Sequence, residues 1–275
     1  MHPSQLGCTT ATFGGKLPEK LEAMQMAGFT STELWPRDVF ENAEGPDVAI
    51  DVLRRSGLAV SVYQALRNYE GMPANLRAHK LGIAEQLMDQ MALIGCKLLV
   101  LCSNTDPESS GERQRIADDL RALGDLARSR DIRIAYEALS WGRWMSDYRD
   151  AWQVIEAADH PCVGMMLDSF HVFALGLPLD GIDAISADKV FLVEIADLPG
   201  TRLEPIEVSR HYRLFPGEGV APIGEFLQRV RGIGYRGCLS VEVFNAHYFA
   251  SAPGAVAMRA MRATTQVLDR LRGVH

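Results

Sequence analysis

Four carboxylates that each follow a mostly apolar run form the pattern in this sequence best suited to chemistry. The acids, each with the run before it, are Glu137 (132–136), Asp168 (162–167), Glu194 (190–193) and Glu242 (239–241). A strand that is buried on both faces reads as a continuous hydrophobic run. An acid at its end is costly to desolvate unless it is paired or binds a metal. The four acids are separated by helix-length segments, so we expect them to converge on one point.

A divalent cation is the simplest partner for such a cluster. Four carboxylates held together would repel one another strongly without a cation. An all-oxygen ligand set suits a hard divalent ion, so we expect one Mg²⁺ or Mn²⁺, with Co²⁺ as a further option, rather than zinc. For any single acid, a helix cap or an arginine partner stays open as an alternative.

One histidine and three arginines complete the candidate site. His171 lies three residues past Asp168, where a neutral imidazole could take a proton from a bound substrate, although a structural loop histidine stays open. Arg67 lies in the segment 63–71, whose Tyr63 and Gln64 we also expect to contact substrate. The residues Arg210 and Arg213 lie in the segment 209–219. Guanidinium forks bind carboxylate or phosphate, so we expect a small anionic substrate, with surface ion pairs as the alternative.

The elements that must position these residues alternate between strand and helix along the chain. The strands are expected at 5–12, 29–35, 58–63, 97–102, 132–137, 162–168, 190–195 and 237–243. The helices are expected at 17–27, 46–56, 74–94, 111–129, 147–158, 178–187, 222–232 and 255–271. Eight such units predict a single α/β domain over residues 1–275, a (β/α)₈ TIM barrel. In such barrels the active site lies at the C-terminal ends of the strands, which is where the four acids fall.

Composition excludes several classes of protein. Of the 275 residues 47% are hydrophobic and 23% charged, which favours a full core, and the net charge of -7 argues against nucleic-acid binding. The chain has no apolar run long enough to span a membrane, and residues 1–5 show no basic or long apolar stretch, so we expect no signal peptide and a cytoplasmic protein. Its five cysteines include no CxxC pair, and we expect buried thiols in a reducing compartment. The irregular segment 197–219 is expected to be a lid or a subunit contact, which leaves a homo-oligomer open.

Several longer motifs resemble a known family. They are Gln64–Gly71 (QALRNYEG), Tyr136–Arg143 (YEALSWGR), Leu167–His171 (LDSFH), Ser209–Arg213 (SRHYR) and Phe215–Gly219 (FPGEG). With the acid pattern they resemble the xylose-isomerase-like barrel superfamily of sugar isomerases, epimerases and related lyases. Within it the chain is most similar, over nearly its whole length, to the bacterial 3-dehydroshikimate dehydratases.

The resemblance implies roles for individual residues. It implies that Glu137, Asp168 and Glu242 bind the metal and that His171 is the base. It also implies that Arg67 and Arg210 hold the substrate, and that the reaction is dehydration of 3-dehydroshikimate to protocatechuate. One position departs from the family pattern: Glu194 stands where a neutral glutamine or histidine is usual, and a fourth carboxylate would weaken the metal as a Lewis acid.

Three other functions remain open from the sequence. A keto-sugar or cyclitol isomerase, epimerase or dehydratase, similar to the inosose dehydratases, would use the same metal and the same enolisation, and Glu194 favours it slightly. A non-catalytic ligand-binding barrel predicts no turnover. A DNA-repair endonuclease of this fold is disfavoured, because the histidine-rich ligand set for several zinc ions is missing and the chain is acidic.

Overall fold

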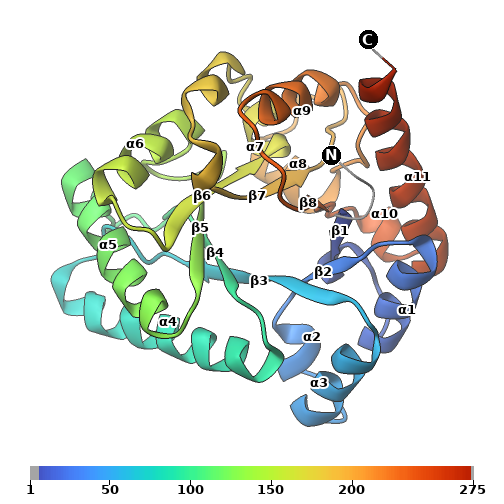
Figure 1. The fold of residues 1–275 in the computed structure, drawn as a ribbon, viewed down its shortest axis with the longest axis horizontal. Helices are drawn as coiled ribbons and strands as arrows, with labels where there is room; N and C mark the ends of the chain where they lie inside the picture. Colours follow the sequence, from blue (N-terminus) through green and yellow to red (C-terminus); the bar gives the residue numbers. More distant parts are fainter. Residues whose placement is uncertain (1–5, 274–275) are drawn as a thin grey trace.

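Eight parallel strands close into a barrel with the helices outside it, in a computed structural model that describes residues 6–273 (Figure 1). The strands pair in chain order, and β8 pairs back to β1. They are β1 (Leu6–Thr9), β2 (Ser31–Leu34), β3 (Ala59–Arg67), β4 (Leu98–Cys102), β5 (Arg133–Glu137), β6 (Val163–Asp168), β7 (Val190–Ile195) and β8 (Leu239–Val241). The expected TIM barrel is confirmed.

The helices alternate with the strands around the ring. The long ones are α1 (Leu17–Ala27), α3 (Pro46–Arg55), α4 (Ala74–Ile94), α5 (Arg113–Ser129), α6 (Tyr148–Ala158), α9 (Ile223–Gly232) and α11 (Pro253–Arg272). Four short helices lie in the loops: α2 (Arg37–Phe40), α7 (Ser169–Ala174), α8 (Pro205–His211) and α10 (Ala246–Phe249). In Figure 1, α1 and α11 lie side by side, where the end of the chain packs against its beginning.

The core has two parts, as the alternation of side chains along each strand requires. A plug inside the barrel is formed by Val62, Leu98, Val100, Cys102, Ala135, Leu139, Met166 and Leu192. A larger layer lies between the strands and the surrounding helices. The plug fills the barrel, so a ligand is restricted to its open end.

Differences from the expected elements concern short segments. The expected helix 178–187 is wrong, because that segment holds two 3₁₀ turns, η3 (Asp180–Ala184) and η4 (Ala187–Lys189). The segment 197–219, expected to be irregular, contains α8. The first strand is shorter than expected, and Gln5 and the N-terminal segment judged for a signal peptide lie outside the described residues.

Two expectations from composition can be compared with the structure. None of the five cysteines forms a disulfide; Cys8, Cys96 and Cys102 are buried as expected, whereas Cys162 and Cys238 are only half-buried. Across residues 6–273, we find no helix with the length and apolar character needed to cross a lipid bilayer.

Candidate active site

Strand alternation directs the predicted acids into the barrel. Val62, Ala135, Met166 and Leu192 belong to the interior plug, and two residues after each comes Gln64, Glu137, Asp168 and Glu194, respectively. Side chains two residues apart share one face of a strand, so all four of these polar groups face the barrel axis just above the plug. Glu242 follows the end of β8 and joins them.

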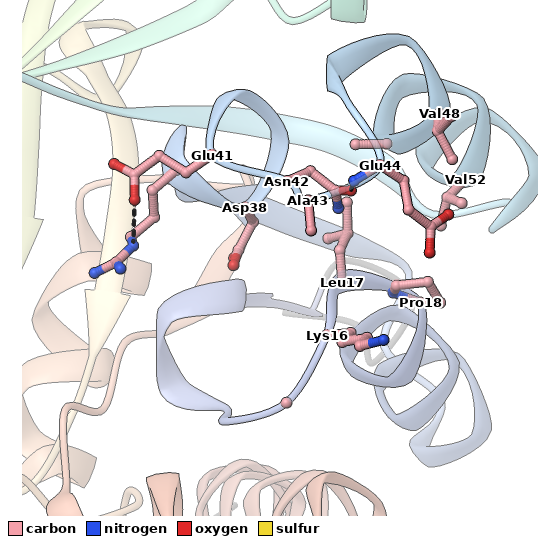
Figure 2. A pocket seen from close by; sticks show the side chains of 13 residues that line it. Lys16, Leu17, Pro18, Asp38, Glu41, Asn42, Ala43, Glu44, Val48 and Val52 are labelled. Atoms are coloured by element: carbon pink, nitrogen blue, oxygen red, sulfur yellow. Dashed lines mark hydrogen bonds and ion pairs between the residues drawn. The ribbon is translucent and has the colours of Figure 1, made fainter.

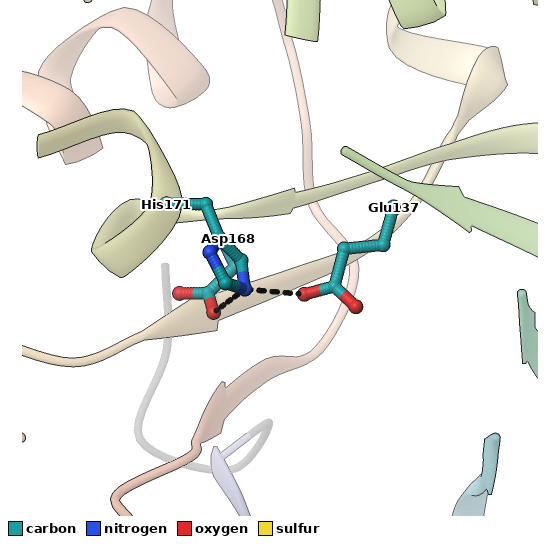
Figure 3. Close-up of side chains that lie close together, drawn as sticks. All are labelled: Glu137, Asp168 and His171. Carbon is teal, nitrogen blue, oxygen red and sulfur yellow. Dashed lines mark ion pairs between the residues drawn. The ribbon is translucent and has the colours of Figure 1, made fainter. Parts of the chain in front are cut away.

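His171 lies against two of the acids (Figure 3). Its Nε2 is 3.3 Å from Oε1 of Glu137 and 3.5 Å from Oδ2 of Asp168. Asp168 caps α7, since its Oδ1 accepts from the backbone N–H of Phe170, and this cap places His171 one turn into the helix beside the acid. On the other side of the ring, Nδ1 meets the backbone nitrogen and the hydroxyl of Ser140. The structure thus brings His171 to the acids, as the sequence predicts.

Arg213 is buried among the acids rather than placed at the cavity rim. Its Nη1 is 2.9 Å from both Oδ2 of Asp168 and Oε2 of Glu242. Its Nη2 donates to the hydroxyl of Ser209, and the guanidinium lies 4.2 Å from the ring centroid of Phe170. In this arrangement Arg213 balances one negative charge of the cluster, and its expected substrate contact stays a prediction.

Gln64 and an unexpected acid, Glu33, form the bottom of the site. The Gln64 side-chain nitrogen is within hydrogen-bond distance of Glu33 (2.7 Å), Glu242 (2.8 Å) and Glu194 (3.0 Å). An amide nitrogen has two hydrogens, so three carboxylates cannot all be satisfied by it. One oxygen each of Glu33 and Glu194 has no partner among the described residues. Gln64 therefore contacts all three acids and, together with Glu242, also lines the cavity.

This donor set fits a divalent cation. Among the described residues, five buried carboxylates face one buried arginine, and an oxygen of Glu33 and one of Glu194 accept no hydrogen bond, which is the donor chemistry that a divalent cation binds. Ligand atoms of Asp168, Glu194 and Glu242 all lie within 4.8 Å of one another, and so do those of Glu137, Asp168 and His171. Asp168 belongs to both groups. One ion shared by all four predicted ligands would therefore require Glu137 or Glu242 to shift.

Burial and mutual repulsion set the charge state of the acids. Burial, followed by the charges of Glu242 and Glu33, raises the pKa of Glu194 well above its ordinary value. Burial also raises the pKa of Glu33 to about 7. For Glu137 the effect of burial is outweighed by the contacts with His171 and by the S–H of Cys102, so its pKa is lowered. A cation at this site would favour the ionised form of all of them.

A cavity of about 770 Å³ opens above the acids. Its lining combines Glu137, Glu242 and His171 with arginines at the rim and two tryptophans, Trp35 and Trp141. Arg67 and Arg210 are exposed and line this cavity. A ligand with a negative group and an oxygen donor could reach both the arginines and the acids. A smaller cavity of about 260 Å³ lies beside α1, α2 and α3 (Figure 2), and Arg37 and Glu41 border both cavities.

One predicted site residue lies elsewhere. Tyr63 is fully buried on the outer face of β3, and its hydroxyl donates to Oε1 of Gln90 on α4. The reason is alternation: Gln64 faces the barrel axis, so its neighbour must face the helices. The expected substrate contact of Tyr63 is not compatible with this position, and we leave Tyr63 out of the proposed site.

The sequence reasoning also missed residues that the structure places here. Glu33 lies in β2 among Ser31, Thr32 and Leu34, where no apolar run marks it. Cys102, at the end of β4, donates its S–H to Oε2 of Glu137 at 3.2 Å. The register pairs Cys102 with Glu137, so the expected barrel order could have predicted this contact.

Comparisons with known proteins agree with this fold. The sequence model described as "Xylose isomerase-like TIM barrel" matches residues 21–267. Over 268 residues, 98% of this chain, the chain is 37% identical to the 3-dehydroshikimate dehydratase of Pseudomonas putida and 36% identical to that of Pseudomonas aeruginosa. The chain spans 42% of the length of each of these two relatives. An inosose isomerase of Bacillus subtilis is 26% identical over 155 residues, 56% of this chain and 55% of that protein.

Solved structures give the same fold. A chain described as a xylose isomerase-like TIM barrel/4-hydroxyphenylpyruvate dioxygenase fusion protein matches with a TM-score of 0.94 and 36% identity, over 98% of this chain and 43% of that one. The IOLI protein, whose structure is described as having a binding zinc atom, matches with a TM-score of 0.84 over 97% of this chain and 99% of that chain. At 19% identity the second match shows the fold alone.

Proposed function

The chain belongs to the xylose isomerase-like TIM barrel family, and on this premise we propose that it is a divalent-metal-dependent hydro-lyase that converts 3-dehydroshikimate to protocatechuate. The observation that carries the proposal is the meeting of four buried strand-end acids and His171 beneath a cavity bordered by Arg67 and Arg210. The names of the Pseudomonas relatives, at 36–37% identity, support this substrate.

Glu137, Asp168, Glu194 and Glu242 would hold the cation, for which Mg²⁺ or Mn²⁺ suits the oxygen donors. When bound, the cation would polarise the ketone of the substrate and make the adjacent C–H more acidic. His171, 3.3 Å from Glu137, would remove that proton through Nε2. The β-hydroxyl then leaves as water, and enolisation gives the aromatic ring.

The arginines would fix the substrate by its carboxylate. Arg67 and Arg210 have no ion-pair partner among residues 6–273, so their guanidinium groups are free to bind an anion. Holding the carboxylate at the rim sets the distance between the ketone and His171, which makes the proton transfer effectively intramolecular. Arg213 is committed to Asp168 and Glu242, so we expect it to orient these acids first.

Turnover of 3-dehydroshikimate by the purified chain tests the proposal. We expect the absorbance of the catechol product to increase with time when Mg²⁺, Mn²⁺ or Co²⁺ is present, and this increase to stop when a chelator is added. His171→Ala should abolish turnover while metal content, measured by elemental analysis, stays that of the wild type. Absence of turnover with every metal tried would defeat the assignment, whereas an active His171→Ala variant would remove only the base.

A second candidate is a keto-sugar or cyclitol isomerase, epimerase or dehydratase. The observation that favours it is Glu194, a second carboxylate beside Glu242 in a place where the dehydratases are expected to have a neutral group. The inosose isomerase relative supports it over about half of the chain. Screening inososes and keto-sugars beside 3-dehydroshikimate under the same metal conditions separates the two.

A further inference from the structure

A third arginine, Arg37, borders the main cavity at the start of α2, just after β2. Its neighbours in α2 anchor this turn of the chain. The side chain of Val39 is fully buried, and Oδ1 of Asp38 lies 2.8 Å from Nζ of Lys20 on α1, in an ion pair that is almost buried. The backbone that carries Arg37 is therefore held in place, although its own side chain is 54% exposed.

The guanidinium group of Arg37 has weak partners within the chain. It lies 4.7 Å from the ring centroid of Trp35, a cation–π distance, and its Nε is 3.4 Å from Oε2 of Glu41 (Figure 2). Both side chains of this ion pair are more than half exposed, and exposed pairs of this kind contribute little. The terminal nitrogens Nη1 and Nη2 have no acceptor among residues 6–273, so they are open to an anion.

The position of Arg37 complements those of Arg67 and Arg210. Arg67 ends β3, the strand that pairs with β2, so Arg37 and Arg67 reach the cavity from adjacent strands. Arg210 reaches it from α8, which follows β7 on another side of the ring. All three side chains line the same cavity. A carboxylate has two oxygens with about four lone-pair directions, so it can accept from two neighbouring guanidinium groups at once.

We propose that Arg37 is a further anion-binding residue, which together with Arg67 holds the carboxylate of a small ring-shaped ligand, and that Glu41 competes with this carboxylate for Arg37. Glu41 contacts only Nε and is exposed, so an incoming carboxylate can displace it. Arg37 and Glu41 also border the smaller cavity, which gives Glu41 room to turn away. The identity of the ligand as 3-dehydroshikimate rests on the proposed function, whereas the anion contact does not.

Calorimetric titration with protocatechuate and with catechol isolates this contact, because the two probes differ only in the carboxylate. The Mg²⁺-loaded wild type should bind protocatechuate more tightly than catechol. Arg37→Gln should weaken protocatechuate binding roughly tenfold, the size of one contact to a charged group, and leave catechol binding unchanged. Arg37→Lys keeps the charge without the fork and should lie between the two. Equal affinity of the wild type for both probes, or equal affinity of wild type and Arg37→Gln for protocatechuate, would overturn the proposal.

Glu41→Gln tests the competition for Arg37. The change removes the partner of Arg37 and a negative charge beside the ligand, so protocatechuate should bind up to about fivefold more tightly, the strength of an exposed ion pair. This gain should disappear when Arg37→Gln is also present. The pair Arg54–Asp51 is the matched control, since it is also 3.4 Å long and more than half exposed but lines neither cavity. Arg54→Gln and Asp51→Asn should leave the affinity unchanged. A Glu41→Gln protein with wild-type affinity would overturn the competition.

Steady-state kinetics separates this inference from the proposed function. If the chain turns over 3-dehydroshikimate, Arg37→Gln should raise KM about tenfold and leave kcat close to that of the wild type, because the carboxylate is held equally before and during the reaction. A lower kcat at unchanged KM would overturn the binding role. If no metal supports turnover but protocatechuate binding still depends on Arg37, the proposed function fails and the anion site stands.

Discussion

At the scale of single residues, Glu194 is the side chain that best distinguishes the two candidate reactions. Glu194→Gln keeps the shape of the side chain and removes its charge. We expect Mg²⁺ affinity to fall, because one ligand charge is lost, and kcat for 3-dehydroshikimate to rise, because the ion keeps more of its own charge. Calorimetric metal titration and steady-state kinetics measure the two effects.

The opposite kinetic result would be equally informative. If Glu194→Gln binds Mg²⁺ but loses its activity, then Glu194 acts as an acid or base, as in the second candidate function. Glu22→Gln, an exposed change on α1, is the matched control for the loss of one negative charge and should leave both measurements unchanged.

Glu70 shows how a buried acid outside the metal cluster makes stability depend on pH. Its Oε1 accepts from the backbone of Asn104 and the hydroxyl of Tyr136, its Oε2 has no partner among the described residues, and burial raises its pKa to about 7. The folded protein therefore keeps a proton that the unfolded chain releases from its ordinary pKa of 4.5 upward. Its contribution to stability is full below pH 4.5 and is lost as the pH rises toward 7.

Glu70→Gln should remove this dependence. As the pH is raised from 5 to 8, the free energy of unfolding of the variant should increase relative to that of the wild type by up to about 3 kcal/mol. Each pH unit over which folded Glu70 keeps its proton contributes about 1.4 kcal/mol to this difference. Urea unfolding of chelator-treated proteins at the two pH values measures the difference. A wild-type-minus-variant difference that is the same at pH 5 and pH 8 would contradict the assignment of the titration to Glu70.

At the scale of elements, the sequence predicts those that have a clear period. The apolar runs locate β5, β6 and β7 and hence the strand-end acids, and the helix α4 begins and ends where its pattern predicts. The short helices α7 and α8 are too short to show a period of 3.6 residues. For the same reason a strand position such as Glu33, flanked by Ser and Thr rather than by an apolar run, is visible only once the barrel is closed.

Asp197 anchors the loop that carries Arg210 and Arg213. Its carboxylate is fully buried and accepts from four backbone N–H groups, those of Leu198, Gly217, Gly219 and Ala221, at 2.9–3.0 Å. Its own backbone pairs with Leu214 in both directions at 2.8 Å. The segment after β7 is thus tied down at its start and again just past Arg213. Loop contacts of this kind lie between distant residues and leave no local sequence signal.

Asp197→Asn should loosen this loop. The amide keeps one acceptor oxygen and turns an N–H₂ group toward backbone donors, so we expect a loss of about 2 kcal/mol in the free energy of unfolding, the cost of leaving buried donors unpaired. Thermal unfolding should show this loss of stability, and in limited proteolysis the protease should cleave first within residues 197–221. Glu207→Gln, exposed on α8, is the control. If the Asp197→Asn protein were cut at the same sites and at the same rate as the wild type, the anchoring role of Asp197 would be contradicted.

At the scale of the whole molecule, the barrel separates charge of opposite sign along its axis. The acids lie deep, on the apolar plug, and the unpaired arginines Arg67 and Arg210 lie at the rim of the cavity. The net charge of -7 repels anions at a distance, so the rim must supply the attraction for an anionic substrate locally. Closure of the barrel brings all five carboxylates into one small, buried volume, so their mutual repulsion and desolvation destabilise the folded protein.

Because the acid cluster destabilises the folded protein, we expect metal binding to raise the stability of the whole fold. An ion that binds only the folded protein stabilises it by about 2.7 kcal/mol at a hundred times its Kd. For a protein of this size that raises Tm by roughly 5–10 °C. Differential scanning calorimetry with Mg²⁺, against NaCl of equal ionic strength, separates site binding from screening of the surface charge. Asp168→Asn removes the acid common to both ligand groups and should abolish the Mg²⁺-specific rise. An equal rise in NaCl, or in the Asp168→Asn protein, would mean that the cluster is not the ion's site.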